Sequence, residues 1–289
     1  MRCLVTGGAG FIGSNLVDKL IDDGHEVIIF DNYSTGKKEN VNPKAKFFLV
    51  DISHQPSFKD KTMEEIMTGV DVVFHLAAKA RVQPSIENPI EYHNTNVNGT
   101  LNMLDACRRY GVKRFIFSSS SSVYGDVEQL PTSEGHELNP MSPYALHKLQ
   151  GEQYFNVYGE RQNTEGAYCL VMGIFAGQLL KGEPMTINGD GENRRDFTYV
   201  GDVVDANIRC MDYPLELNGE AFNIGNGDNR SVNQIANLLS EDGDRINKES
   251  VIEPKETLAN NSKAKKILGW KPTNKIENWI IDYKEEMGL

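Results

Sequence analysis

The first half of the chain alternates short apolar runs with segments of helical periodicity. Five runs rich in β-branched and aromatic residues read as strands, at 3–5, 26–30, 46–50, 71–75 and 114–117. Between them, residues 12–21 and 95–110 carry apolar side chains three and four positions apart, which predicts amphipathic helices. Strands that alternate with helices form parallel sheets covered on both faces. We therefore expect an α/β chain with a doubly wound parallel sheet.

The second half of the chain has a different pattern. After about residue 157 the alternation gives way to turns rich in Gly, Pro and Asn, at 182–184, 189–191 and 225–227. We expect a first, Rossmann-type domain at 1–154 and a smaller mixed lobe at 155–289. A segment near 198–212 is expected to return to the first domain.

Composition and charge narrow the classes of partner. The 41 acidic residues exceed the 30 Lys and Arg, for a net charge of -11. This balance repels phosphate backbones and anionic lipids, so we expect no nucleic acid and no membrane partner. Apolar runs such as 70–76 are shorter than the roughly 20 residues of a membrane helix. Cys3, Cys107, Cys169 and Cys210 lack metal-ligand spacing, so we expect free thiols, no metal site and a cytoplasmic protein.

A glycine-rich loop joins the first strand to the first helix. Gly7, Gly10 and Gly13 lie three apart, a variant of the dinucleotide fingerprint in which backbone N–H groups hold a pyrophosphate. Asp31 ends the second strand, close to where an acid accepts hydrogen bonds from the adenosine ribose. A carboxylate there repels a 2′-phosphate, which favours NAD over NADP. In the alternative interpretation, Asp31 is only a turn residue before Asn32.

A serine run and a Tyr-Lys pair provide candidate chemistry. Tyr144 and Lys148 lie four apart and share one face of a helix that begins near Pro143. Residues 118–122 are five serines at the carboxyl end of the fifth strand, where open α/β sheets bind ligands. A tyrosine, with an ordinary pKa of about 10, needs nearby cations to act as a base, and Lys148 and an oxidised nicotinamide would supply two. In the alternative interpretation, the serines form a solvated loop and Tyr144 packs in the core.

Taken together, the motifs resemble the extended short-chain dehydrogenases/reductases, and within them the nucleotide-sugar 4-epimerases. In the first half they are GGAGFIG at 7–13, DN at 31–32, DI at 51–52, HLAA at 75–78, NVNGT at 96–100, SSSSSVYG at 118–125 and SPYALHK at 142–148. The resemblance resumes with YFNVYGERQ at 154–162, GDG at 189–191, RDFTYV at 195–200, FNIG at 222–225, TLA at 257–259 and GW at 269–270. It therefore covers nearly the whole chain.

The resemblance implies a role for each matching residue. Ser120 takes the place of the catalytic serine, Tyr144 that of the general base, and Lys148 that of its partner on the nicotinamide ribose. With Tyr144 and Lys148, the expected NAD-binding residues are Gly7, Gly10, Phe11, Ile12, Gly13, Asp31, Asn32, Asp51, Ile52, Leu76, Ala77, Ala78, Asn96, Ser118 and Tyr154. The expected substrate-binding residues are Ser120, Ser122, Tyr144, Asn156, Arg195 and Thr257.

The implied reaction is C4 epimerisation of a UDP-hexose through a transient 4-keto sugar. In relatives, a small residue at the position of Thr257 leaves room for a 2-acetamido group, so UDP-GlcNAc and UDP-GalNAc are expected beside UDP-glucose and UDP-galactose. A UDP-glucuronate 4-epimerase, or another nucleotide-sugar-modifying enzyme, is the alternative. A non-catalytic NAD-binding regulator is less favoured, because Ser120, Tyr144 and Lys148 are all present. The resemblance also implies a homodimer, formed through the helices around 96–110 and from 144 onward.

Two stretches are shorter than in those relatives. Only seven residues separate Lys148 from Asn156, whereas a parallel crossover needs roughly a dozen or more. Near 249–255 no arginine matches a diphosphate-binding arginine of relatives, and Arg245 is the nearest upstream. Either these are real deletions, or the protein contains residues that this chain lacks, the interpretation we favour. An intact mass near 32.3 kDa would establish the deletions.

Overall fold

The computed structural model describes residues 1–54, 61–127, 129–149, 156–158, 160–162, 164, 169–250 and 254–289. It divides into two compact units. Unit 1 comprises Met1–Val123, Pro140–Gln153 and Val204–Gly219, and unit 2 comprises Tyr124–Asn139, Tyr154–Val203 and Glu220–Leu289. Each unit is described by itself.

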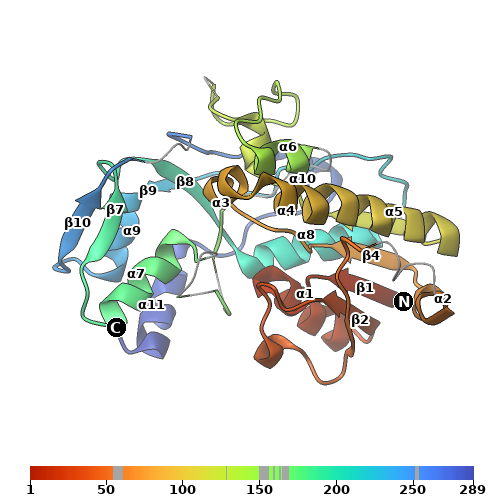
Figure 1. The fold of residues 1–289 in the computed structure, drawn as a ribbon. Helices are drawn as coiled ribbons and strands as arrows, with labels where there is room; N and C mark the ends of the chain where they lie inside the picture. The colour runs from red at the N-terminus through yellow and green to blue at the C-terminus, as the bar shows by residue number, and fades with distance from the viewer. Residues whose placement is uncertain are drawn as a thin grey trace. The chain divides into compact units, whose positions relative to one another are not determined.

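Unit 1 is built on a parallel sheet of five strands in the order β3-β2-β1-β4-β5 (Figure 1). The strands are β1 (Arg2–Thr6), β2 (Glu26–Asp31), β3 (Lys46–Leu49), β4 (Val72–His75) and β5 (Arg114–Phe117). The order reverses between β1 and β4, which pair in register with Thr6 opposite His75. In open α/β sheets, ligands bind at the carboxyl ends of the strands at such a reversal. The predicted doubly wound sheet is confirmed.

Helices cover both faces of this sheet. On one face, Leu16, Val17 and Leu20 pack against strand residues; on the other, Met103 and Ala106 do so. The α-helices of unit 1 are α1 (Phe11–Asp22), α2 (Lys61–Met67), α3 (Val82–Glu87), α4 (Pro89–His93), α5 (Gly99–Tyr110) and α6 (Pro143–Leu149). The segment expected as one helix at 95–110 begins instead with a π-helical turn at Asn94–Asn98, and α5 follows it. Such turns are frequent at functional sites.

The end of helix α8 (Val200–Asp212) is fixed to unit 1 by one arginine. The Arg114 guanidinium donates hydrogen bonds to the carbonyl oxygens of Cys210, Met211 and Tyr213, at 2.6, 2.8 and 2.9 Å. The last carbonyls of a helix have no partner within the helix, so these bonds satisfy groups that would otherwise need water. Val204 and Met211 of α8 also lie in the core of unit 1.

Unit 2 has two small sheets and its own core. A three-stranded sheet has the order β6-β8-β9, and a two-stranded parallel sheet joins β10 to β7. The core gathers around Phe175, Ile235 and Trp279. The elements are β6 (Asn156–Tyr158), α7 (Val171–Leu180), β7 (Met185–Asn188), β8 (Arg194–Tyr199), β9 (Asn229–Ser231), α9 (Val232–Leu239), β10 (Arg245–Lys248), α10 (Ser262–Ile267) and α11 (Ile276–Met287).

Several sequence features meet the described residues only in part. The short connection after Lys148 falls mainly on residues 150–155, which lie outside them, as does Tyr154. The four cysteines are free thiols, and three of them are buried. Among the described residues, no helix combines the length and apolar character that a membrane span requires.

Candidate active site

The glycine loop leaves β1 at the carboxyl edge of the sheet. Gly7 has a left-handed backbone with φ +72°, and a Cβ added there would lie 2.9 Å from the Ala77 backbone nitrogen. A Cβ on Gly13 would overlap the Gly7 carbonyl oxygen. Gly10 precedes α1, and among the described residues no side chain caps this helix end. The first N–H groups of a helix then depend on water or a ligand, so the loop suits a pyrophosphate.

Asp31 connects the end of β2 to the glycine loop. Its carboxylate is buried and accepts hydrogen bonds from the backbone N–H groups of Ala9, at 3.0 Å, and Tyr33, at 2.7 Å. Burial raises the pKa of Asp31, and these donors oppose the rise. One donor reaches each carboxylate oxygen, so each oxygen retains capacity to accept a ribose hydroxyl.

The other residues expected around the adenosine lie on the same side of the sheet order. The Asn32 amide donates to the Asp51 carboxylate at 3.3 Å, which joins the ends of β2 and β3. Ile52 is buried, and a Cβ added to Gly99 would lie 2.8 Å from its side chain. Gly99 therefore lets α5 approach Ile52 closely.

The segment after β4 forms the next wall. Leu76, Ala77 and Ala78 are half-buried. The Asn96 side chain accepts from the Lys79 N–H at 2.8 Å and donates to the Lys79 carbonyl at 2.9 Å. Asn96 lies on the π-helical turn that precedes α5.

The serine run and α6 meet at the end of β5. The Lys148 ammonium donates to the Ser118 carbonyl at 2.7 Å and lies 4.8 Å from the centre of the Phe117 ring. The Ser119 hydroxyl donates to the Lys148 carbonyl at 2.9 Å. These contacts fasten α6 to the sheet and place Lys148 beside the serines.

Ser120 and Tyr144 are joined by a hydrogen bond between their side chains. The Ser122 hydroxyl donates to the Ser120 oxygen at 2.8 Å. The Ser120 proton is then available for Tyr144, where it favours the phenolate. The Tyr144 backbone N–H donates to the Ser85 hydroxyl at 3.1 Å, which supports the start of α6. The structure thus brings Ser120, Tyr144 and Lys148 together, as the spacing predicts.

Three residues in this group were not predicted as parts of the site. Ser85 and Ser119 hold the two ends of α6, and Phe117 lies beside the ammonium. Ser119 belongs to a run whose members look alike in the sequence, and Ser85 lies in a short helix without any motif. Only the tertiary contacts reveal their roles.

Burial controls the protonation of the pair on α6. It raises the pKa of Tyr144, although the Ser120 hydrogen bond acts in the opposite direction. It lowers the pKa of Lys148 to about 7. The protein alone therefore keeps the tyrosine protonated at neutral pH, and an additional cation is needed to make it a base.

The residues expected to bind substrate are in unit 2, apart from the serines and Tyr144. The Arg195 guanidinium donates to the carbonyls of Arg194, at 2.8 Å, and Lys255, at 3.3 Å. The Thr257 hydroxyl accepts from the Asp196 N–H at 3.3 Å, so Thr257 lies next to the same strand. Asn156 begins β6 opposite Phe197 of β8.

Arg194, the neighbour of Arg195, has a different environment. Its guanidinium donates to the side chain of Asn229 at 2.8 Å and to the Asn229 carbonyl at 2.9 Å. These bonds tie β8 to β9 and give Arg194 a structural part.

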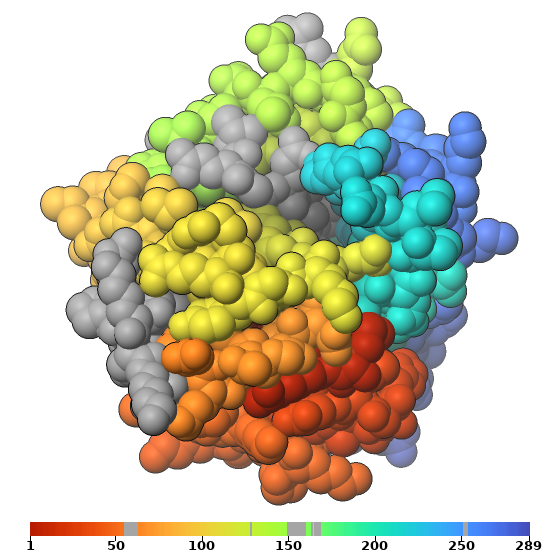
Figure 2. Space-filling view, turned by 90° about the vertical axis from the view of Figure 1, so that its right-hand side faces the viewer, coloured from red at the N-terminus to blue at the C-terminus, as the bar shows by residue number. Residues whose placement is uncertain are grey.

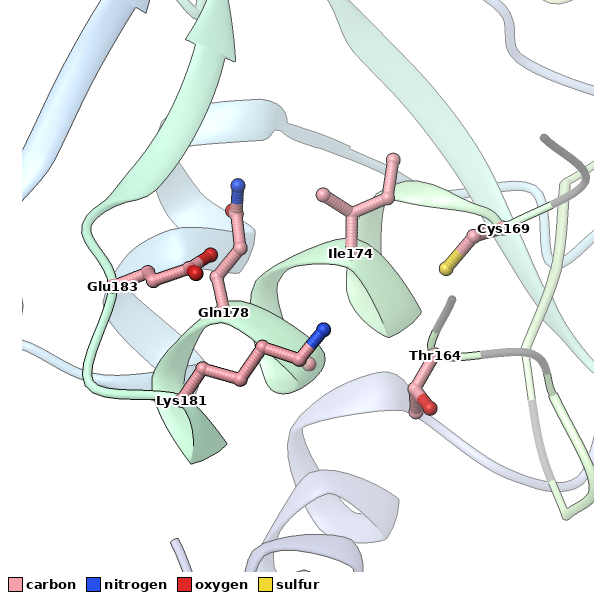
Figure 3. A pocket seen from close by; sticks show the side chains of 7 residues that line it. Thr164, Cys169, Ile174, Gln178, Lys181 and Glu183 are labelled. Carbon is pink, nitrogen blue, oxygen red and sulfur yellow. The ribbon is translucent and has the colours of Figure 1, made fainter. Parts of the chain in front are cut away.

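Unit 2 also contains two hollows away from these residues. One, of about 380 Å³, is lined by side chains of α7 together with Thr164 and Cys169 (Figure 3). The other, of about 470 Å³, lies along residues 124–139. None of the substrate-binding residues predicted from the sequence lines either hollow.

Comparison with known proteins identifies close relatives along the whole chain. Residues 3–155 and 153–225 match the model of the NAD dependent epimerase/dehydratase family. The putative UDP-glucose 4-epimerase of Methanocaldococcus jannaschii is 39% identical over 308 residues, with 96% of this chain and 97% of that protein covered. The UDP-glucose 4-epimerase of Mycolicibacterium smegmatis is 35% identical, with 94% of each covered. The first alignment is longer than this chain, so that relative contains residues without a counterpart here.

Solved structures give the same result. A UDP-glucose 4-epimerase from Thermotoga maritima with UDP-glucose has a TM-score of 0.92 and 38% identity, with 100% of both chains covered. A UDP-N-acetylglucosamine 4-epimerase from Methanobrevibacter ruminantium, in complex with UDP-N-acetylmuramic acid, has a TM-score of 0.87, 33% identity and coverage of 96% and 95%. A UDP-glucuronic acid 4-epimerase from Bacillus cereus, in complex with UDP-glucuronic acid and NAD, has 0.88, 30% identity and coverage of 100% and 99%.

The loop geometry predicts the effect of one added methyl group. Gly13→Ala places a Cβ on the Gly7 carbonyl, so the loop must open. We expect the NAD released by denaturing the purified protein to fall about tenfold or more, a loss of about 1.4 kcal/mol or more in binding. Gly135→Ala is the control, because a Cβ there meets nothing within 4 Å. An NAD content equal to that of the control would show that the loop does not hold the cofactor.

Proposed function

The chain belongs to the NAD dependent epimerase/dehydratase family, and on that premise we propose that it interconverts UDP-glucose and UDP-galactose by epimerisation at C4. The observation that carries this proposal is the joined group of Ser120, Tyr144 and Lys148 at the carboxyl edge of a sheet that also carries the glycine loop. Relatives named UDP-glucose 4-epimerase, similar along nearly the whole chain, support the choice of sugar.

NAD fits the residues of unit 1. When bound, NAD accepts a hydride from C4 of the sugar and returns it to the opposite face of the 4-keto sugar. The uncapped start of α1 and the loop of Gly7, Gly10 and Gly13 suit its pyrophosphate. Asp31 suits the adenosine ribose and would repel a 2′-phosphate. The remaining residues proposed to line the cofactor are Phe11, Ile12, Asn32, Asp51, Ile52, Leu76, Ala77, Ala78, Asn96 and Ser118.

The proton of the sugar O4 is the part of the reaction that the protein itself handles. Tyr144 Oη takes this proton as the 4-keto sugar forms and returns it when the hydroxyl is restored. Ser120 donates to the phenolate and holds the sugar oxygen, while Ser122 fixes Ser120. Lys148 supplies the positive charge that lowers the pKa of Tyr144 against the effect of burial. The same ammonium is placed to bind the nicotinamide ribose.

The serine run also supports epimerisation over elimination. A 4,6-dehydratase must remove water between C5 and C6, which requires a further acid and base. Ser120, Ser121 and Ser122 occupy the end of β5, where no carboxylate is present among them. Isomerisation at C4 needs only the one base that Tyr144 provides.

In unit 2, Asn156 and Arg195 are proposed to hold the diphosphate, and Thr257 to border the sugar. A guanidinium pairs with phosphate oxygens in a bidentate way, which suits Arg195. The small Thr257 side chain supports acceptance of UDP-GlcNAc and UDP-GalNAc beside the unsubstituted sugars. A UDP-glucuronate 4-epimerase is the second candidate, favoured by the similarity to the Bacillus cereus structure.

The surroundings of the protein can also be proposed. Free cysteines are typical of a reducing compartment, which supports the cytoplasm. The net charge of -11 disfavours nucleic acid and anionic membrane surfaces as partners.

A homodimer is supported by apolar side chains on three helices of unit 1. Ile90 on α4, Leu101 and Leu104 on α5, and Leu146 on α6 are 77%, 60%, 44% and 50% exposed. Figure 2 shows the yellow segment, which contains α5, at the surface. Apolar groups exposed on neighbouring helices mark an interaction surface, because burying them against a partner is favourable. A second copy of this chain is the proposed partner.

The direct test of the function is conversion without added cofactor. Purified protein incubated with UDP-glucose is expected to yield UDP-galactose, resolved by chromatography. Tyr144→Phe removes the base and should lower kcat by about 100- to 10,000-fold. Tyr110→Phe is the matched control and should retain activity. A Tyr144→Phe enzyme as active as the control, or conversion of UDP-glucuronate but not UDP-glucose, would contradict the proposal.

The charge on Lys148 predicts a change in pH dependence. Lys148→Met removes a cation beside Tyr144, so the pKa of the tyrosine rises and the base form requires a higher pH. We expect the acidic limb of the kcat profile, at saturating NAD, to move upward by about one to two pH units. Lys113→Met, an exposed lysine of unit 1, is the control. An unmoved limb would mean that Lys148 does not set the pKa of Tyr144.

The proposed dimer predicts the effect of charge on α5. Leu101→Glu combined with Leu104→Glu places two carboxylates in the surface that would be buried, and burial of unpaired charge is costly. Analytical ultracentrifugation is expected to show a dimer for the wild type and a monomer for this variant. Leu215→Glu, at a leucine 64% exposed elsewhere in unit 1, should remain dimeric. A dimeric double variant would place the interface elsewhere.

A further inference from the structure

The imidazole of His75 is buried at the reversal of the sheet, and the proposed reaction gives it no part. His75 ends β4 beside the strand that leads into the glycine loop. Its ring lies 5.4 Å from that of Phe115 and 5.7 Å from that of Phe117. Burying a polar ring is unfavourable unless its nitrogens are hydrogen-bonded. Both nitrogens have partners here.

The hydrogen bonds around this ring run in one direction. The Ala77 N–H donates to the Thr6 hydroxyl at 3.1 Å, so the Thr6 proton is free to be donated to His75 Nδ1, at 2.9 Å. At the other side, the Thr100 hydroxyl donates to the Asn96 carbonyl at 2.7 Å. Thr100 Oγ1 must therefore accept from His75 Nε2–H, at 3.0 Å. His75 is consequently fixed as one neutral tautomer.

Charge and burial keep that tautomer neutral. Burial lowers the pKa of His75 to about 3, and the nearby Lys148 charge acts in the same direction. A protonated ring would have a hydrogen on Nδ1 facing a Thr6 hydroxyl that already donates there. The directional chain therefore persists throughout the neutral pH range.

This chain holds one short segment of backbone at both ends. Thr6 binds the N–H of Ala77, and the Asn96 side chain binds both the N–H and the carbonyl of Lys79. Since Thr100 in turn holds the Asn96 carbonyl, His75 links the two attachments.

The held segment lies against the glycine loop. A Cβ on Gly7 would be only 2.9 Å from the Ala77 nitrogen, so the two backbones are in close contact. Movement of Ala77 by a few tenths of an ångström would displace the loop or open a gap beside it. Tight interiors transmit such shifts because they contain little free space.

We propose that His75 is a positioning residue for the cofactor: through Thr6, Thr100 and Asn96 it holds residues 77–79 against the glycine loop and so limits the escape of NAD. The inference rests on the proposed function only in taking NAD as the resident cofactor. His75 touches neither the sugar nor the transferred proton. Its effect is on the retention of NAD, and the proton transfer by Tyr144 is unaffected.

Thr100→Val tests this by cutting the chain at a distance from the loop. Valine keeps the shape of threonine but neither accepts from His75 nor donates to Asn96. Thr68→Val is the matched control, because the Thr68 hydroxyl likewise donates to the carbonyl four residues earlier, that of Glu64, in unit 1. Each holoenzyme is mixed with isotopically labelled NAD, and exchange of the bound NAD is followed by mass spectrometry.

We expect NAD exchange to be about tenfold or more faster in Thr100→Val than in Thr68→Val, while kcat at saturating NAD stays within about threefold of the control. Equal exchange rates, or a fall in kcat with unchanged exchange, would overturn the proposal. If Thr100→Val does not fold, His75→Asn serves instead, because it keeps an acceptor toward Thr6 and loses the donor toward Thr100.

The two proposals can fail separately. Faster exchange in Thr100→Val, with a wild type that converts no UDP-sugar, would leave the role of His75 intact and refute the proposed function. A wild type that epimerises UDP-glucose, with equal exchange in both valine variants, would refute the role of His75 alone.

Discussion

The arrangement of the site depends on the buried ammonium of Lys148 and its hydrogen bond to the Ser118 carbonyl. Taking an ammonium out of water is costly, and its pKa of about 7 reflects that cost. The 2.7 Å bond and the adjoining Phe117 ring offset part of it. Because Tyr144 lies one helical turn earlier on α6, the bond that fixes Lys148 also fixes the tyrosine. The Ser119 hydroxyl provides a second attachment of the same helix to the same strand end.

This arrangement makes the chemistry dependent on the cofactor. Burial alone raises the pKa of Tyr144, so the protein without a second cation holds a phenol and not a base. A bound oxidised nicotinamide supplies that cation at the step where the sugar proton must leave. The account therefore requires NAD to stay bound through the whole cycle, since the hydride removed from C4 returns to the same carbon. The hydrogen-bonded chain through His75 serves that requirement from the other side of the loop.

The sequence allowed prediction of what local spacing decides. The five strands, the glycine loop, Asp31 at the end of β2 and the four-residue spacing of Tyr144 and Lys148 all depend on periodicity within one or two elements. The π-helical turn at Asn94–Asn98 interrupts a segment that reads as one helix, because apolar spacing changes little when one residue is added to a turn. The supports from Ser85 and Thr100, and the different partners of Arg194 and Arg195, depend on contacts between distant segments. No spacing within the chain encodes those contacts.

The central claim is that one retained NAD takes a hydride from C4 and gives it back to C4. UDP-glucose deuterated at C4 tests this directly when it is incubated with the purified protein in ordinary water without added NAD. The account predicts UDP-galactose that keeps its deuterium at C4, as measured by mass spectrometry and proton NMR. Replacement of the deuterium by solvent hydrogen would show that C4 exchanges a proton with water, which would contradict transient oxidation by a retained cofactor.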